Sequence, residues 1–425
     1  MSADPSQLEW NQGSVSDPLI FLSAGEASGE AYGALLISEL QARCAAAGVA
    51  PRFLGMGGER MRALGLERIV RSEDVAVMGI TEVVRHLPRI YAEYRKLKSA
   101  IQERKPDVAV LIDFPDIHLK LAQELHAHGI SVIFFVSPQL WAWKKGRIRK
   151  VQRFVDRMLV IFPFEEPFYR ERGVDATYVG HPLADLPLPA ISRDQFATED
   201  GLDPRNRWIG LLPGSRPKEI RLNLPEMIEA ARILYCHDPA TEFLLPIAPT
   251  LTMAQIHIVT GMLTELAQGL PIRMVRDARA TLRHACGSIV ASGTATVEAA
   301  LIGKPFVVVY RVSPVTYWIA KRVVTVPHVA MVNLIAGRRI VPELIQHDFT
   351  ASKVVEQLRS LLENEEARAT MQSDLRSVGA LLKVSSDGGT KETAIEHAAR
   401  IALQLIPAAQ QPRLQSALVS PWPVE

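Results

Sequence analysis

The sequence predicts an α/β protein made of two doubly wound halves, each a parallel sheet covered by helices on both faces. Short apolar segments alternate with longer amphipathic ones, as in successive β-α units. This alternation starts again after a proline-rich stretch at residues 181–190. A length of 425 residues also suits two large domains better than one small core. We therefore expect two sequential domains.

Each half contains five predicted strands, and we place the domains around them. The first-half strands are residues 19–23, 52–54, 108–112, 132–136 and 157–161, and the second-half strands are 208–212, 242–246, 272–275, 288–291 and 305–309. The predicted domains are residues 1–186 and 187–390, followed by a helix returning toward the first domain and a flexible tail at 391–425. Ligands bind such folds at the carboxyl ends of the strands, which predicts a site in the cleft between the halves.

The composition excludes several functional classes. With 48 Lys and Arg against 46 Asp and Glu, the net charge of +2 does not indicate nucleic acid as a partner. Three widely spaced cysteines fit neither a zinc site nor a disulfide framework. No basic segment precedes Arg43, and no apolar stretch has the roughly 18 to 20 residues of a membrane-spanning helix. We expect a cytoplasmic protein that meets a membrane only at its surface.

Carboxylates follow two strands of the first half. Glu26, Ser28 and Glu30 lie in a loop with glycines at positions 25, 29 and 33, which lets the backbone pass close to a ligand. The alternative is a tight turn in which Ser28 caps a helix. Asp113 and Asp116 follow the third strand, where a half-buried acid favours a functional role. We assign Asp113 as a general base and Asp116 as a helix cap.

The second half carries the strongest signal for a nucleotide diphosphate. After its first strand, Gly214 allows close backbone approach, Ser215 supplies a hydroxyl and Arg216 can bind a diphosphate through two hydrogen bonds. The second element of the site is a strand-to-helix turn. Its helix N-terminus can bind an anion, and an acid one turn later can bind ribose hydroxyls; its residues are Ser292, Gly293, Thr294 and Glu298.

Other motifs give weaker or negative signals. The turn Gly55–Gly58 resembles a dinucleotide fingerprint, but Arg60 stands where the third glycine belongs, so a nicotinamide or flavin cofactor is weakly supported. Asp-x-x-Asp is not a dependable metal motif, so we infer no metal. His181 at the hinge is a candidate for the cleft, although a lone histidine is more often structural. Trp141 and Trp143 line either a pocket or the core.

Residues 77–101 form a predicted amphipathic helix with two readings. Its apolar positions include Val83, Val84 and Leu87, and cations such as Arg85 and Arg89 flank them. One apolar stripe normally faces the core. The dense cations make docking on an anionic lipid surface the alternative. Pro88 should break or kink this helix. Residues 315–326 show a similar combination.

Seven ordered motifs resemble the lipid-A-disaccharide synthase family. They are AGEASG at 24–29, AVMGITEV at 76–83, IDFPD at 112–116, SPQLWAW at 137–143, LLPGSR at 211–216, ASGTATVE at 291–298 and NLIAGR at 333–338. The resemblance implies the GT-B architecture, two Rossmann-like domains facing a cleft, and an inverting glycosyltransferase. Such an enzyme would join the sugar of UDP-2,3-diacylglucosamine to 2,3-diacylglucosamine 1-phosphate in a β-1,6 linkage and release UDP, without a metal.

The resemblance also implies roles for individual residues. It assigns the essential acid to Asp113 and a UDP contact to Arg216, and it adds Asn333 to the donor site. Ser292, Gly293, Thr294 and Glu298 complete that site, and Glu26, Ser28 and Glu30 fall in the N-terminal loop on the acceptor side. The family usually has Asp where this chain has Glu30, and Phe-Asn where it has Ile117 and His118. Acceptor contacts at these positions therefore stay open.

The resemblance also implies partners for the protein, and several alternative functions stay open. The resemblance implies the inner surface of the cytoplasmic membrane as a docking partner, and it allows a homodimer. The alternative functions are a soluble glycosyltransferase acting on unacylated sugars, a UDP-sugar epimerase or hydrolase, and a binding module without catalysis. Acceptor-dependent release of UDP separates the transferase from the others.

Overall fold

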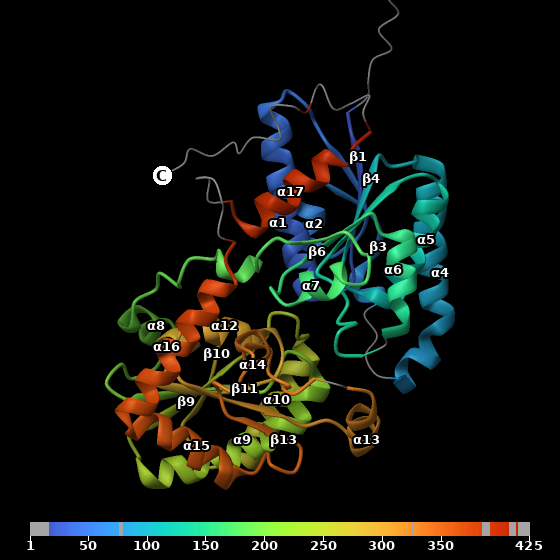
Figure 1. Ribbon diagram of the computed structural model, residues 1–425. Coiled ribbons are helices and arrows are strands. Elements are labelled where there is room, and N and C mark those ends of the chain that lie inside the picture. Colours follow the sequence, from blue (N-terminus) through green and yellow to red (C-terminus); the bar gives the residue numbers. More distant parts are fainter. Residues whose placement is uncertain are drawn as a thin grey trace, which may run out of the picture.

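The protein consists of two parallel sheets, one in each lobe of the molecule (Figure 1). The computed structural model describes residues 17–75, 80–143, 145–324, 326–384, 392–407 and 414, with only the backbone for 80–87 and 145. The first sheet has the order β3-β2-β1-β4-β5-β6-β7 and the second β10-β9-β8-β11-β12-β13. The strands are β1 Leu19–Ala24, β2 Arg52–Gly57, β3 Leu66–Arg71, β4 Val108–Ile112, β5 Ser131–Phe135, β6 Arg157–Val160, β7 Ala176–Tyr178, β8 Arg207–Leu212, β9 Thr241–Pro246, β10 Ile272–Val275, β11 Gly287–Ala291, β12 Phe306–Tyr310 and β13 Glu343–Ile345.

Helices connect the strands and cover the sheets. They are α1 Ala27–Ala46, α2 Glu59–Ala63, α3 Ser72–Val75, α4 Ile80–Arg104, α5 Pro115–Ala127, α6 Ile148–Phe154, α7 Glu165–Arg170, α8 Arg193–Asp200, α9 Pro217–His237, α10 Met253–Leu266, α11 Ala278–His284, α12 Thr294–Ile302, α13 Pro314–Val323, α14 Met331–Ala336, α15 Ala351–Glu363, α16 Glu365–Leu381 and α17 Ala394–Gln404, with short 3-10 helices η1 Lys145–Arg147 and η2 Pro182–Ala184.

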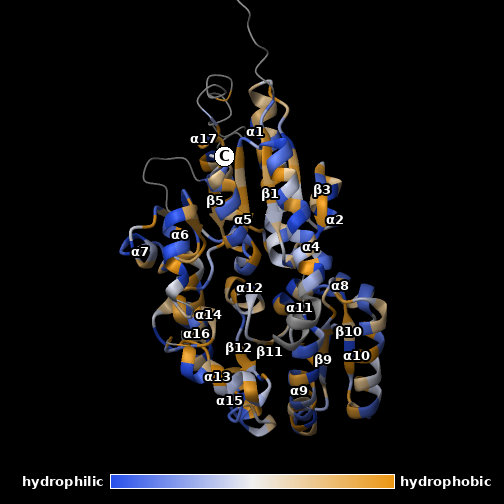
Figure 2. Ribbon diagram, turned by 90° about the vertical axis from the view of Figure 1, so that its right-hand side faces the viewer, coloured by the Kyte–Doolittle hydropathy of each residue, from blue (hydrophilic) through white to orange (hydrophobic). Residues whose placement is uncertain are grey.

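The central strands are buried on both faces. Along β1, Ile20 and Leu22 belong to one hydrophobic cluster, whereas Leu19 and Phe21 belong to another on the opposite face. Figure 2 shows the strands as largely hydrophobic ribbons between helices of mixed hydropathy. Burial on both faces is why these strands appear in the sequence as nearly continuous apolar runs.

Each sheet has one point where the order of its strands reverses. β1 pairs with both β2 and β4 (Ala24 opposite Ile112), and β8 pairs with both β9 and β11 (Leu212 opposite Val290). At such a switch point the two connections leave in opposite directions and open a crevice at the carboxyl ends of the strands. The loops after β1, β4, β8 and β11 lie at these two points.

All ten predicted strands are present, with small differences at their ends. The structure adds β3, β7 and β13, and each of them lies at the edge of its sheet. An edge strand has one neighbour and needs less apolar sequence: β3 reads LERIVR, and the other two have only three residues each. These features hid them from a search for apolar runs.

Helix α4 continues through Pro88, so of the predicted break or kink the break is wrong. A proline inside a helix removes one backbone hydrogen bond. The second half of α4 is anchored in the core by Leu97 and Ile101. Val83, Val84, Arg85 and Leu87 fall in the part of α4 where side chains are outside the described residues.

The C-terminal helix α17 lies against α1 of the first lobe (Figure 1). The buried Arg43 on α1 contacts Glu39 at 2.6 Å and Glu392, just before α17, at 3.3 Å. Arg400 on α17 also contacts Glu392, at 3.0 Å. The end of the chain is thus tied to its first helix. The proposed domain boundary at 186/187 lies between β7 and β8.

Candidate active site

The first side of the candidate site is formed by the loops after β1 and β4. Because these strands are neighbours and parallel, their loops leave the same edge of the sheet. Gly25 packs so closely against Phe114 that a Cβ there would lie 2.3 Å from its ring. Glu26 follows with an extended backbone and makes no capping hydrogen bond to α1. The loop thus holds Glu26 beside the segment that carries Asp113.

Asp113 and Phe114 have left-handed backbones, with φ angles of 53° and 52°. This conformation is unfavourable for residues other than glycine and persists only where the surroundings enforce it. His118 is the enforcing group: its Nδ1 lies 2.6 Å from the Asp113 carbonyl oxygen and its Nε2 2.8 Å from Ser23 Oγ. Burial lowers the pKa of His118 to about 4. The neutral ring therefore donates from Nδ1 and accepts the Ser23 hydroxyl at Nε2.

Asp113 has the electrostatic environment of a general base. Burial, and next the negative charge of Glu26, raise its pKa to about 6, while the Phe114 N–H and Arg216 act in the opposite direction. The Phe114 N–H donates to Oδ1 over 2.9 Å. A carboxylate with this pKa is ionised at neutral pH and accepts a proton more readily than an ordinary aspartate.

The second side is formed by the loop after β8. Gly214 has a φ of +117°, and a Cβ there would lie 2.5 Å from the Glu219 carboxylate, so the position needs glycine. Arg216 stands directly before α9 and reaches across to the first lobe. Its Nη2 lies 2.7 Å from Glu26 Oε2, and its Nη1 lies 3.4 Å from Glu219 Oε1. Ser215, next to it, is exposed.

The loop after β11 completes the second side. β11 is paired with β8, so its loop leaves the sheet beside that of Arg216. Gly293 has a φ of +149° with open space at its Cβ position, and Thr294 begins α12. Both are exposed, which leaves this helix N-terminus accessible to an anion. The Ser292 hydroxyl donates to the Val329 carbonyl over 3.3 Å.

The charge of Glu298 in the second lobe acts on Tyr32 in the first lobe. Burial raises the pKa of Tyr32 far above its usual range, and the charges of Glu298 and Asp113 add to this effect. Burial also raises the pKa of Glu298, which Arg279 opposes. Tyr32 was not predicted, and no spacing in the sequence marks it. It is a residue of α1, whereas Glu298 belongs to α12 of the other lobe.

Asn333 belongs to the interior of the second lobe. Asn333 is fully buried: its Oδ1 accepts the Ile340 and Val341 N–H groups, and its Nδ2 donates to Glu343 over 2.7 Å. Glu343 in turn accepts the N–H groups at 329 and 330, so Asn333 supports the segment that holds Ser292. The direct contact of Asn333 with UDP stays a prediction.

His181 lies in the interior between Tyr32 and Phe162, and burial lowers its pKa to about 3. Its Nδ1 accepts the Leu183 N–H over 3.2 Å. These contacts favour the structural role over a position in the cleft.

Several acceptor-side expectations are also modified. Ser28 lies inside the first turn of α1 and does not cap it. Glu30 accepts the Arg60 N–H over 2.9 Å. Ile117 and His118, where the chain departs from the family pattern, are buried, and His118 bonds the Asp113 carbonyl oxygen. Asp116 does not cap α5: Phe114 occupies that position, and Asp116 pairs with Arg147.

The SPQLWAW segment proves to be anchored by a buried acid. Glu165 accepts hydrogen bonds from the Ser137 hydroxyl (2.7 Å), Trp141 Nε1 (2.9 Å) and the Phe162 N–H (3.1 Å). Burial raises its pKa to about 7. Trp141 is thus held in the structure, whereas Trp143 is exposed. Glu165 lies 24 residues beyond Trp141, and nothing in the sequence connects the two.

Neither a cluster of metal ligands nor a membrane-spanning helix is found among the described residues. Across the described ranges, no group of three or more His, Cys, Asp or Glu side chains could hold a metal ion. None of the helices among the described residues combines the length and apolarity that crossing a bilayer requires.

Comparison with solved structures identifies the architecture. A glycotransferase of kitacinnamycin matches with a TM-score of 0.58 and 14% identity over 92% of this chain and 100% of that one. A UDP-GlcNAc 2-epimerase from Neisseria meningitidis, solved with UDP-GlcNAc bound, matches with a TM-score of 0.57 and 12% identity over 86% of this chain and 96% of that one. These likenesses confirm the predicted GT-B fold and, at such low identity, concern the fold alone.

Comparison of sequences identifies the family. A protein from Acidobacterium capsulatum named lipid-A-disaccharide synthase is 62% identical over 92% of this chain and 97% of its own length. One of the same name from Koribacter versatilis is 50% identical over 91% and 98%. The sequence pattern that defines the lipid-A-disaccharide synthetase family matches residues 20–395. That range includes both switch points and every residue of the cleft described above, so the chain belongs to the lipid-A-disaccharide synthetase family of glycosyltransferases.

Proposed function

We propose that this chain transfers the sugar of UDP-2,3-diacylglucosamine to the 6-hydroxyl of 2,3-diacylglucosamine 1-phosphate, with release of UDP and formation of a β-1,6 linkage. Membership of the family supports the activity. One structural observation carries the assignment to the cleft. Arg216, after the switch-point strand β8, forms a 2.7 Å ion pair with Glu26, which follows β1 of the other lobe, the neighbour of the strand that precedes Asp113. In this proposal the base and the arginine that binds the diphosphate therefore lie at the same junction of the two lobes.

In the proposed mechanism, Asp113 removes the proton of the acceptor hydroxyl. The hydroxyl oxygen attacks the anomeric carbon as the bond from that carbon to the diphosphate oxygen breaks, so configuration inverts in one displacement. The proton ends on Asp113, and the bonding electrons leave with UDP. The pKa of about 6 supports this role, because the carboxylate is ionised at neutral pH and still accepts a proton from the reacting hydroxyl.

The donor side stabilises the leaving group. Arg216 and the accessible N-terminus of α12 at Gly293 and Thr294 supply positive charge where the diphosphate develops negative charge. Gly214 and Ser215 bring backbone and hydroxyl donors to the same place. In this proposal Glu298 binds the ribose hydroxyls, and Ser292 shapes the loop.

An acceptor-dependence assay tests the function. UDP release from UDP-diacylglucosamine is measured with and without the acyl sugar phosphate, and the product is identified by mass spectrometry. The expected result is release only with acceptor and a product with the mass of the joined disaccharide phosphate. Release from donor alone would indicate a hydrolase, and a rearranged UDP-sugar would indicate an epimerase. Either result contradicts the proposal.

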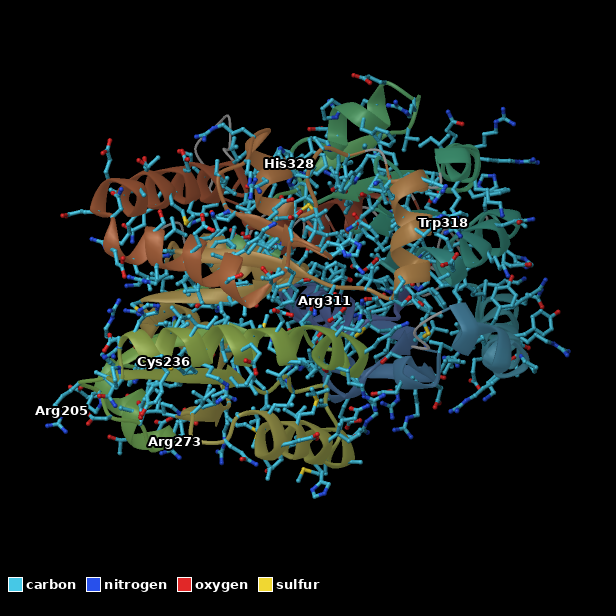
Figure 3. All side chains as sticks on the ribbon, turned by 90° about the horizontal axis from the view of Figure 1, so that it is seen from below. Arg205, Cys236, Arg273, Arg311, Trp318 and His328 are labelled. Carbon is cyan, nitrogen blue, oxygen red and sulfur yellow. The ribbon has the colours of Figure 1, made fainter. Side chains whose placement is uncertain are left out.

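We also propose that the protein docks on the inner surface of the cytoplasmic membrane, where both lipid substrates would reside. Helix α13 supports this: none of its residues is buried, and Val315 and Trp318 are 70% and 59% exposed. Figure 3 shows Trp318 on α13, at a side of the molecule away from α9 and α10, and Figure 2 separates them likewise. Lys321 and Arg322 add positive charge without any acid in the helix, which suits anionic lipid.

Two further parts of this proposal rest on the sequence: docking through the start of α4, and assembly into a homodimer. The apolar positions Val83, Val84 and Leu87, with Arg85, belong to the amphipathic start of α4 and stay a prediction. Arg89 on the same helix pairs with Asp74 at 2.5 Å. The homodimer that the family resemblance allows can be measured by sedimentation equilibrium.

A further inference from the structure

Arg216 forms an ion pair with Glu26, and the proposed function assigns the same Arg216 guanidinium to the donor diphosphate. Glu26 precedes α1 in the first lobe, and Arg216 precedes α9 in the second, so the pair crosses the cleft. Its Nη2–Oε2 distance is 2.7 Å, whereas the contact of Arg216 with Glu219 in its own lobe is 3.4 Å. The shorter of these two contacts therefore comes from the opposite lobe.

A diphosphate and Glu26 compete for the same guanidinium. The two side chains of the pair are 34% and 39% exposed, and ion pairs that water reaches this freely contribute little. A diphosphate carries more negative charge than one carboxylate and can accept two parallel hydrogen bonds from arginine. Glu26 makes no capping hydrogen bond with α1 that would hold it in place. The donor can therefore displace it.

We infer that Glu26 is a placeholder for the donor diphosphate, and that its release from Arg216 upon donor binding strengthens Asp113 as a base. In the empty enzyme Glu26 pairs with Arg216 and keeps the guanidinium oriented in the cleft. In the donor-bound enzyme the diphosphate binds Arg216. The Glu26 carboxylate is then released from Arg216, and its negative charge acts on Asp113. The inference rests on the proposed role of Arg216 and adds a link from donor occupancy in one lobe to the base in the other. Glu26 is thus a positioning residue.

The charges around Asp113 support this link. Among the described residues, Glu26 before α1 and Arg216 before α9 act on Asp113 by charge, Tyr32 on α1 responds to its charge, and His118 on α5 bonds its carbonyl oxygen. Burial raises the pKa of the Tyr32 hydroxyl and lowers the pKa of the His118 ring, so both side chains are uncharged at physiological pH. Glu26 raises and Arg216 lowers the pKa of Asp113. A diphosphate bound to Arg216 cancels the lowering effect of Arg216 on the pKa of Asp113 and leaves the raising effect of Glu26.

Titration calorimetry with UDP tests the placeholder directly. Glu26→Gln removes the competing charge, so UDP should bind about two- to fivefold more tightly than to the wild type, the range set by a weak exposed ion pair. The matched control is Glu59→Gln, which removes an acid that pairs with Arg62 and Arg68 in the same lobe and should leave the UDP affinity unchanged.

The pH profile tests the effect on the base. The acidic limb of kcat should move down by about half a pH unit or more in Glu26→Gln, because a negative charge near Asp113 is lost. Glu26→Asp keeps the charge but is one methylene shorter, so it should bind UDP more tightly and move this limb less. The inference is overturned if wild type binds UDP and Glu26→Gln binds it equally or more weakly, or if the limb does not move. If wild type does not bind UDP at all, the proposed function itself fails.

Discussion

At the scale of single residues, the site depends on an unfavourable backbone at Asp113 and Phe114. Two successive left-handed residues cost of order 1 to 3 kcal/mol each, and hydrogen bonds to His118 and the tight contact with Gly25 hold them there. The Asp113 carboxylate accepts the Phe114 N–H within this turn. Strain and an elevated pKa at one residue are typical of a functional site.

The raised pKa of Asp113 predicts opposite effects on activity and stability. The value of kcat/KM should fall as the pH drops through about 6, because Asp113 becomes protonated in the free enzyme. Since the folded-state pKa lies above the ordinary value of 3.8, ionisation costs stability, a cost that appears between about pH 4 and 6 and persists above. Asp113→Asn should thus lose turnover by several orders of magnitude, retain UDP binding, and gain up to about 3 kcal/mol of unfolding free energy at pH 8.

Urea denaturation of Asp113→Asn at pH 8 and pH 4 checks the stability arm, and calorimetry with UDP checks binding. The stabilisation should be absent at pH 4. Turnover close to that of the wild type would rule out Asp113 as the base.

His118 is predicted to be a positioning residue. His118→Phe keeps an aromatic ring of similar size but removes the bonds to the Asp113 carbonyl and the Ser23 hydroxyl. Relaxation of the turn should lower kcat by about 10- to 100-fold, as expected for loss of about 1 to 3 kcal/mol, with the KM for donor nearly unchanged. Steady-state kinetics measure both values, and Ile117→Val is the neighbouring buried control. A rise in donor KM with unchanged kcat would place His118 in substrate binding instead.

At the scale of elements, α17 and α1 form the joint that returns the chain to its first lobe. Arg43 is completely buried and contacts acids on both sides of this joint, Glu39 on α1 and Glu392 before α17. A buried charge is tolerated only while such partners remain. The helix behind the Glu26 loop is therefore fixed partly by residues from the end of the chain.

Removal of Arg43 should destabilise this joint strongly. Arg43→Ala leaves buried carboxylate charge at Glu39 without this partner, and loss of one partner of a buried pair typically costs about 3 to 5 kcal/mol. Arg62→Ala, which breaks the exposed pair with Glu59, is the control and should leave the unfolding midpoint unchanged. Chemical denaturation measures both variants. Equal midpoints for the two would show that the joint depends on apolar packing alone.

At the scale of the whole molecule, loops at the switch points of the two separate sheets come into contact through Glu26 and Arg216. The cluster that includes Ile20 and Leu22 of the first sheet also includes Ile209 and Leu211 of the second, so the apolar core is continuous between the lobes. This continuity and the Glu26–Arg216 pair align the base with the donor site. The exposed helix α13 lies outside this core and gives the second lobe an unburied apolar face.

The exposed face of α13 should contribute to membrane retention. Replacing Val315 and Trp318 by Ser should lower co-sedimentation with vesicles containing phosphatidylglycerol, and added salt should weaken binding further because Lys321 and Arg322 contribute by charge. Met253→Ser on α10, at a site 79% exposed, is the control for general loss of surface hydrophobicity. Unchanged retention of the α13 variant would remove this helix from the docking surface.

The sequence by itself determined the two-sheet α/β architecture, ten of the strands, the loops that carry Asp113 and Arg216, and the turn before Glu298. The central strands are buried on both faces and must be apolar throughout, and the loops carry glycines where the backbone needs them. Local composition records such requirements. The edge strands β3, β7 and β13 did not meet them and were missed, whereas the edge strand β10 was predicted.

Only the tertiary structure decided which polar residues face the cleft and which support it from behind. Asn333 and His181 were expected at the site but are buried, whereas Tyr32, His118 and Glu165 were not predicted. The Glu26–Arg216 pair joins residues 190 positions apart. A side chain's role depends on the groups that surround it, and these come from distant segments that meet only when both sheets fold and their switch points come together.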